Sequence, residues 1–221
     1  ARSIDFGETW EAGEPIDILP FTGIPGADGN NICTLPDGTD IVAISHRYGD
    51  GIRDHQGVEL PLDEKGGIDF VYRSTDGGRT WGGRTAIAKY TGESRFLSLG
   101  EDRVLAAIRR QRWFLSSQDP PELWEQTGGG QDIINKQLYL ANSYDGGRTW
   151  KDMRQLTTAN GDCPGELVRL SDNRIVVLYY NRYPYVPGYT IARVSEDGGV
   201  TWSVERYVVS TGSGYSSSTV L

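Results

Sequence analysis

One octapeptide occurs four times in this chain, as SIDFGETW (3–10), STDGGRTW (74–81), SYDGGRTW (143–150) and SEDGGVTW (195–202). All four copies share the pattern Ser-x-Asp-x-Gly-x-Thr-Trp. Their serines are 71, 69 and 52 residues apart. A motif that returns at such intervals indicates a repeat architecture in which each copy marks one supersecondary unit.

Each copy has the composition of a hairpin tip. The Asp carboxylate can accept backbone N–H groups of the turn, and the Ser hydroxyl does so more weakly. The glycines tolerate a positive φ, which a side chain would oppose. We expect the Trp ring to be buried beside the next unit.

The segments between the octapeptides contain short apolar runs bounded by turn residues, which is typical of strands. We expect four strands in each of three units. The first has Asn31–Leu35, Ile41–His46, Ile68–Arg73 and Ala86–Ala88; the second has Phe96–Leu99, Val104–Ile108, Gln137–Asn142 and Gln155–Thr158; the third has Glu166–Leu170, Ile175–Tyr180, Tyr189–Val194 and Arg206–Val209. The longest connections are 49–67 and 114–133, and loops of this length are often functional.

Composition supports an all-β protein that forms a single domain over residues 1–221. The chain has 29 Gly, 10 Pro, 6 Trp and 12 Tyr, which suits a turn-rich β fold. A net charge of −8 argues against a nucleic-acid partner, and no apolar run is long enough to span a membrane. The first residues contain no charged-then-apolar leader, so a signal peptide is absent or already removed, which is compatible with a secreted or periplasmic location. His46 and His55 form no metal-ligand cluster, and we expect no metal or cofactor.

The octapeptides match the Asp-box, or BNR repeat, of the sialidase (neuraminidase) superfamily. The resemblance implies a β-propeller of four-stranded blades, with each box between the third and fourth strands. In that family the boxes lie on the face away from the active site. The resemblance therefore implies a structural role for the four box aspartates, which are Asp5, Asp76, Asp145 and Asp197.

Against this family pattern, the chain contains three whole blades and two partial ones. It opens at the end of a third strand, and Gly214–Leu221 is similar to the first strand of a further blade. Because the family typically closes about six blades, the chain resembles a fragment or a truncated relative. A four-bladed ring completed by the two ends is the alternative. An open arc would expose strand edges, which favours self-association.

Arginines follow the second strand of each unit, at Arg47, Arg109 and Arg182. Convergent arginines can bind a carboxylate bidentately. Sialidases hold the carboxylate of their sugar with an arginine triad, and these three are similar in position. The alternative is that each arginine pairs with an acid at the edge of its own blade.

The stretch from Leu35 to Trp81 resembles the sialidase blade whose long loop carries the acid/base Asp. Asp54 and Asp50 are the matching candidates, with Asp54 favoured because it lies deeper in the loop; Asp50 is equally suited to a turn. The same blade departs from the family pattern, because residues 28–30 are Asp-Gly-Asn where sialidases have Arg-Ile-Pro. This departure weakens the case for sialic-acid hydrolysis.

Two further residues complete the catalytic set that the resemblance implies. Glu166 precedes a first strand and matches a pocket acid, although it also suits a solvated strand position. Tyr215 in Gly-Tyr-Ser resembles the tyrosine nucleophile of sialidases, although few blades separate it from the acid-bearing loop. Trp113 and Tyr180 offer aromatic faces for stacking on sugar rings; the alternative is that each packs on its own blade.

The resemblance thus implies a sialidase-like glycoside hydrolase that cleaves a terminal acidic sugar from a glycan. Two alternatives stay open. One is a non-catalytic propeller that binds a glycan or a protein, because fold does not imply function. The other is an enzyme that acts on a different sugar. In each of these interpretations except the protein-binding propeller, the partner of the chain is a carbohydrate.

Overall fold

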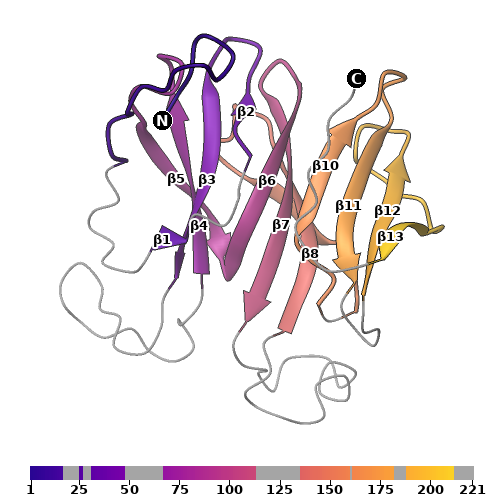
Figure 1. Cartoon of the computed structure of the whole chain (residues 1–221). Coiled ribbons are helices and arrows are strands. Elements are labelled where there is room, and N and C mark those ends of the chain that lie inside the picture. The colour runs from indigo at the N-terminus through magenta and orange to yellow at the C-terminus, as the bar shows by residue number, and fades with distance from the viewer. Residues whose placement is uncertain are drawn as a thin grey trace, which may run out of the picture.

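The computed structural model describes residues 1–16, 25–26, 31–47, 67–112, 135–159, 161–181 and 188–211. Within these ranges the regular elements are all strands, and there is no helix of the length and apolarity needed to cross a membrane. The strands gather in three antiparallel sheets that stand side by side (Figure 1). The prediction of an all-β fold is therefore confirmed.

In the first sheet, two short strands take the place of a single first strand; in each sheet we call the first strand the inner strand. Its strands are β1 (Pro25–Gly26), β2 (Cys33–Thr34), β3 (Asp40–Arg47), β4 (Gly67–Ser74) and β5 (Gly82–Lys89). β1 pairs with one end of β3, at Ser45–His46, and β2 pairs with the other end, at Asp40–Ile41. The sequence predicted one inner strand here and did not predict β1.

The second and third sheets are four-stranded meanders in chain order. The second contains β6 (Thr91–Gly100), β7 (Arg103–Arg112), β8 (Asn135–Ser143) and β9 (Lys151–Gln155). The third contains β10 (Gly165–Arg169), β11 (Ile175–Asn181), β12 (Tyr189–Ser195) and β13 (Tyr207–Thr211). β7 and β11 both end at the lower end of the molecule in Figure 1.

The core lies between the sheets. The second strand of the middle sheet, β7, is apolar at every position from Val104 to Ile108 because both of its faces are buried. Successive side chains of a strand point to opposite faces. Val104, Ala106 and Ile108 pack in a cluster with the first sheet, whereas Leu105 and Ala107 pack in a cluster with the third. A strand buried on both faces needs apolar residues at every position.

The octapeptides form loops between the third and fourth strands, at β4–β5, β8–β9 and β12–β13, with a fourth loop in the N-terminal segment. We call these the octapeptide loops. In each, the Ser hydroxyl donates to the Asp carboxylate at 2.7–2.8 Å, and the Thr backbone N–H donates to the same carboxylate at 2.8–2.9 Å. The Thr hydroxyl donates to the second carboxylate oxygen at 2.5–2.6 Å. Every carboxylate thus closes its own turn.

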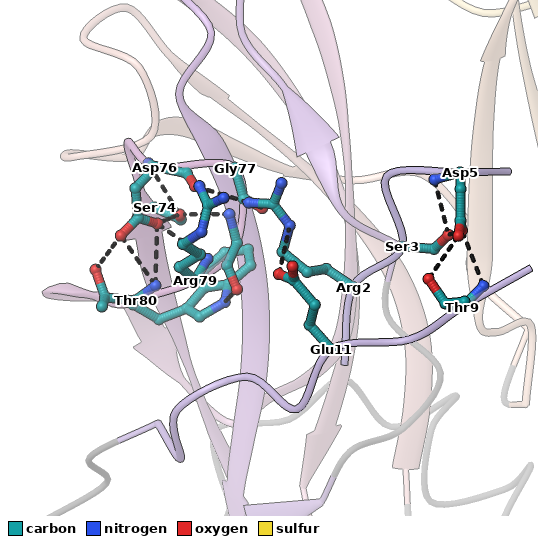
Figure 2. A network of polar contacts seen from close by, with 12 residues as sticks. Arg2, Ser3, Asp5, Thr9, Glu11, Ser74, Asp76, Gly77, Arg79 and Thr80 are labelled. Atoms are coloured by element: carbon teal, nitrogen blue, oxygen red, sulfur yellow. Dashed lines mark hydrogen bonds and ion pairs between the residues drawn. The ribbon is translucent and has the colours of Figure 1, made fainter. Parts of the chain in front are cut away.

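Arginines tie these loops to the preceding part of the chain. Arg2 donates to the backbone oxygens of Asp76 and Gly77 at 3.1 and 3.0 Å, so it links the first octapeptide segment to the second loop (Figure 2). Arg73 donates to Gly147 O and Arg154 to Gly199 O. Each of the three later loops therefore accepts at least one arginine hydrogen bond on its backbone oxygens.

Two local expectations are wrong. The fourth strand of the second unit runs over Lys151–Gln155 and not Gln155–Thr158, because its polar side chains hid a strand that pairs with β8 directly after the loop. Trp10 is 66% exposed rather than buried. Trp150, in contrast, stacks on Phe96 with ring centroids 5.2 Å apart.

Candidate functional site

Buried polar side chains concentrate at the end of the sheets opposite the octapeptide loops, where β6 and β10 begin. This end also receives the last residues of β3, β7 and β11, since the strands are antiparallel. Its buried polar residues include Ser45, Asp69, Thr91, Glu93, Ser94, Arg95, Arg109, Asp162, Glu166 and Asn181. We call this the polar end. Buried ionisable groups of this kind are expected at functional sites more than elsewhere.

Glu166 lies on the inner strand of the third sheet and forms an ion pair with Arg95 on the inner strand of the second. The Arg95 Nη1 atom donates to Glu166 Oε2, and both side chains are less than a tenth exposed. Burial raises the pKa of the Glu166 carboxyl, while its contact with Arg95 opposes that rise. The predicted pocket acid is thus a buried, paired carboxylate and not a solvated strand residue.

Arg109 forms a second buried ion pair, within the second sheet. Its Nη1 atom lies 2.5 Å from Glu93 Oε1, and the two side chains are 8% and 1% exposed. The Arg109 Nε atom is buried and has no acceptor among the described residues. The guanidinium therefore retains a donor that a ligand oxygen can use.

A third buried acid, Asp162, lies four residues before Glu166. Asn181 donates to Asp162 Oδ1 at 2.5 Å, while Asp162 Oδ2 is buried with no partner in the described part of the chain. Burial raises the pKa of Asp162 to about 6, against the opposing effects of Asn181 and Arg206. This carboxyl titrates near neutral pH, where a proton donor or acceptor is most effective.

Asp69 connects the first sheet to the second. Its side chain is fully buried, and its oxygens accept hydrogen bonds from the Ser45 hydroxyl and the Ser94 backbone N–H. Burial raises the pKa of Asp69, although these hydrogen bonds and the nearby Arg109 act in the opposite direction.

Strand register shows that the three predicted arginines are not equivalent. The octapeptide serines lie opposite Asp40, Val104 and Ile175 on the second strands. Counted from these residues, Arg47 and Arg182 lie seven positions on, whereas Arg109 lies five positions on. The position equivalent to Arg47 and Arg182 is held by Gln111. Arg109 therefore lies two residues nearer the octapeptide end of β7 than Gln111 does.

Tyr180 does not present an aromatic surface to solvent. The residue is 6% exposed, and its hydroxyl accepts a hydrogen bond from Gly188 N–H at 3.0 Å. The ring is therefore buried, and its hydroxyl bonds to the residue directly before β12 of the same sheet.

Several predicted site residues lie outside the described part of the chain, namely Asp50, Asp54, Trp113, Arg182 and Tyr215. The Asp-Gly-Asn sequence at 28–30 and the expected closing strand also lie outside it, and only the backbone of Arg47 is described. The described residues bring Arg109 and Glu166 to the same end of the sheets. Among them, there is no group of three or more His, Cys, Asp or Glu residues that could hold a metal ion.

Glu93 and Arg95 are the partners that the sequence analysis missed. They lie in Thr-Gly-Glu-Ser-Arg, immediately before the apolar run at the centre of β6. The signal that could have found them is their position, since they lie near the beginning of a first strand just as Glu166 does. Charged residues in a stretch where every side chain from 91 to 96 is buried require partners.

The aspartates of the octapeptide loops have lowered pKa values, in contrast to the buried acids of the polar end. Hydrogen bonds from the Thr and Ser side chains and the backbone lower the pKa of Asp5 and of Asp197 to about 2. For Asp145, slight burial acts to raise the pKa, but the same hydrogen bonds outweigh it and lower the value to about 2. The pKa of Asp76 is lowered as well.

A cavity of about 500 Å³ lies between the N-terminal segment and β3, near the octapeptide end. Its walls include Ile32, Val42, Ile44 and Trp81, together with Asp40, which pairs with the loop serine Ser74. This cavity therefore lies at the wrong end of β3 to include the buried ion pairs. We place the candidate site at the polar end, where the ionisable groups lie, and not in this cavity.

No protein-family model matches the sequence, and no curated protein matches it. The fold, in contrast, resembles several solved structures. A protein of unknown function from Dyadobacter fermentans superposes with a TM-score of 0.64 at 16% identity, covering 96% of this chain and 52% of that one. The leech intramolecular trans-sialidase complexed with 2,7-anhydro-Neu5Ac has a TM-score of 0.53 at 14% identity, covering 91% and 46%.

The Penicillium chrysogenum α-L-arabinanase complexed with arabinobiose has a TM-score of 0.50 at 15% identity, covering 90% of this chain and 51% of that one. The chain thus spans about half the length of each of these structures. At such low identities the likeness concerns the fold alone. The chain therefore has the β-propeller fold shared by sialidases and related glycosidases.

Proposed function

We propose that this protein acts on glycans as a sialidase-like glycoside hydrolase, removing a terminal acidic sugar at the polar end of the sheets. The observation that carries the proposal is the pair of buried Arg–Glu contacts at the polar end, Arg95–Glu166 and Arg109–Glu93. The fold supports it, because solved structures of the same fold hold a sialic-acid derivative and arabinobiose.

Arg109 supplies the chemistry that an acidic sugar requires. A guanidinium binds a carboxylate in a planar, bidentate fashion, and the contact is stronger where water is excluded. The buried Nε donor of Arg109 lacks an acceptor among the described residues, which supports a ligand oxygen as its partner. We propose that Arg47 and Arg182 contribute further cationic contacts to the same carboxylate.

Glu166 suits the role of the base that activates a nucleophile. Burial raises the pKa of its carboxyl, so the ionised form is a stronger base than an exposed glutamate. We propose that Glu166 takes the phenolic proton of Tyr215 as the tyrosine oxygen bonds to the anomeric carbon. The glycosidic C–O bond breaks in the same step, as Asp54, or Asp50 in its place, protonates the departing oxygen. Water hydrolyses the tyrosyl intermediate in the reverse sense and releases the sugar.

The test is release of umbelliferone from an umbelliferyl sialoside. We expect turnover by the folded wild-type chain and loss of about 100-fold or more in Arg182→Ala and Glu166→Gln, since each removes a charged group from the reacting site. The matched control is Arg174→Ala, which removes an exposed arginine that pairs with Asp172 at the octapeptide end. No turnover by the folded protein, or equal turnover by all variants, would contradict the proposal.

A binding protein without hydrolysis is the second candidate, and one observation favours it. Arg109 and Glu166 each already have an ion-pair partner and are 6% exposed, so a ligand must compete for them. A free acidic sugar would then raise the melting temperature by binding the native state. A clear rise without umbelliferone release would favour this candidate over the hydrolase.

A further inference from the structure

The inner strand of the second sheet begins with a strained bulge. Glu93 has a φ of 51°, which non-glycine residues seldom adopt. The pairing of β6 with β7 shifts register between Gly92 and Arg95, so the bulge interrupts the ladder at this point. Such strain persists only where surrounding contacts hold it, and bulges near active sites re-aim side chains.

The contacts that hold the bulge come from the first sheet. The Ser45 hydroxyl oxygen accepts the Glu93 backbone N–H at 3.1 Å, and one Asp69 oxygen accepts the Ser94 backbone N–H at 2.9 Å. Ser45 in turn donates to the other Asp69 oxygen at 2.5 Å. Ser45 and Asp69 face each other directly across β3 and β4. Together they grip two consecutive amides of the neighbouring sheet.

The bulge determines where the Arg109 guanidinium lies. The Glu93 carboxylate, aimed by this backbone, binds Arg109 Nη1 at 2.5 Å. Gly92 leaves room for the guanidinium, because a Cβ atom there would lie 3.2 Å from Arg109 Nη2. The guanidinium thus lies against a carboxylate and a glycine that belong to one strained turn.

We propose that Asp69, acting through Ser45, is a positioning residue that sets the orientation of the anion-binding Arg109 from the neighbouring sheet. The relay runs from Asp69 to Ser45, then through the Glu93 backbone to the Glu93 carboxylate, and so to Arg109. The identity of the ligand, an acidic sugar, rests on the proposed function, whereas the positioning of Arg109 does not.

The first experiment measures ligand charge discrimination. We would determine the dissociation constants of N-acetylneuraminic acid and of its neutral methyl ester for the wild type and for Asp69→Asn. We expect the acid to bind the variant about tenfold more weakly, as for a lost hydrogen bond to a charged group, with little change for the ester. The matched control is Asp172→Asn, an exposed aspartate in a turn. An equal loss for both ligands, or no loss for either, would overturn the proposal.

The second experiment needs no ligand. The Nε–H NMR signal of Arg109 is identified by its absence in Arg109→Lys. We expect Asp69→Asn and the milder Ser45→Ala to shift this signal and to speed its exchange with water, while Asp172→Asn leaves it unchanged. Circular dichroism establishes that each variant is folded, and Ser45→Ala serves if Asp69→Asn is not. An unmoved signal in the folded variants would refute the relay even if the sugar binds. If the wild type binds no acidic sugar but the signal moves, the proposed function fails and the relay stands.

Discussion

The octapeptide end and the polar end of the sheets both carry aspartates, but the environment of the carboxylate differs. At the octapeptide end, hydrogen bonds lower the pKa of Asp5, Asp145 and Asp197 to about 2. At the polar end, burial raises the pKa of Asp162 to about 6 and also raises that of Asp69. The ionised form of aspartate is thus stabilised at the octapeptide end and destabilised at the polar end.

This difference separates architecture from chemistry. A carboxylate surrounded by N–H and O–H donors strengthens the fold at neutral pH, because its ionised form is the one that the native state prefers. A buried carboxylate with an unpaired oxygen weakens the fold at the same pH. Groups that oppose stability are expected where activity requires them.

The largest effect is expected at the buried Arg95–Glu166 pair. Glu166→Ala removes the carboxylate that neutralises Arg95 in the interior, which should lower the free energy of unfolding by about 3–5 kcal/mol. The double variant Arg95→Met, Glu166→Leu should recover most of this stability without recovering activity. Urea denaturation checks both. At the octapeptide end, Asp172→Ala breaks the exposed ion pair with Arg174 and should change stability little. Similar losses of stability in Glu166→Ala and Asp172→Ala would contradict the difference between the two ends.

The next effect should have the opposite sign. Asp162→Asn removes a carboxyl group whose pKa is raised by burial from 3.8 to about 6. This shift corresponds to about 3 kcal/mol of free energy by which the ionised carboxylate destabilises the folded state. The charged form opposes folding fully above pH 6, and this cost disappears as the pH falls towards 4. We therefore expect the variant to be more stable than the wild type at pH 8 and equal to it near pH 4. Denaturation at both pH values tests this, and a variant less stable at pH 8 would refute the assignment.

A third effect tests the packing of the octapeptide loops. Gly198 and Gly199 both have positive φ, at 72° and 86°, so alanine is strained at either position. A Cβ at Gly199 would lie 2.7 Å from Leu105 Cδ2, whereas nothing lies within 4 Å of a Cβ at Gly198. Gly199→Ala should therefore cost about 1–3 kcal/mol more than Gly198→Ala. Equal melting temperatures for the two variants would show that the loop does not pack on the middle sheet.

The smallest effect is expected from Asp145→Asn, the counterpart of Asp162→Asn at the octapeptide end. Loss of the anion that accepts from Thr149 should cost about 1 kcal/mol near pH 7, since this carboxylate is only partly buried. The lowered pKa means that this stabilisation is present above pH 4 and is lost as the pH falls towards 2. Activity per folded molecule should be unchanged. A large loss of activity would contradict the structural role that we propose for this aspartate.

The candidate site could be predicted only in part from the sequence. The sequence suggested Glu166 because an acid at the beginning of a first strand is expected to face the site, and the structure shows this carboxylate buried at the polar end. Arg109 was found from its place at the end of a second strand, but its depth relative to Arg47 could not be, because that depends on the pairing register. Glu93 was missed because its partner lies sixteen residues away on the adjacent strand and its turn has an unusual backbone conformation.

By itself, the sequence determined the repeat, most of the strands and the closure of the octapeptide loops. These are local properties, since the contacts within each loop join residues no more than four positions apart. Only the tertiary structure decided which charges are buried and how they pair. Asp69 and Ser94 are 25 residues apart, and Arg95 and Glu166 are 71 apart. Pairings over such separations are created when sheets pack against one another, because packing removes water from groups that are solvated in the isolated strands.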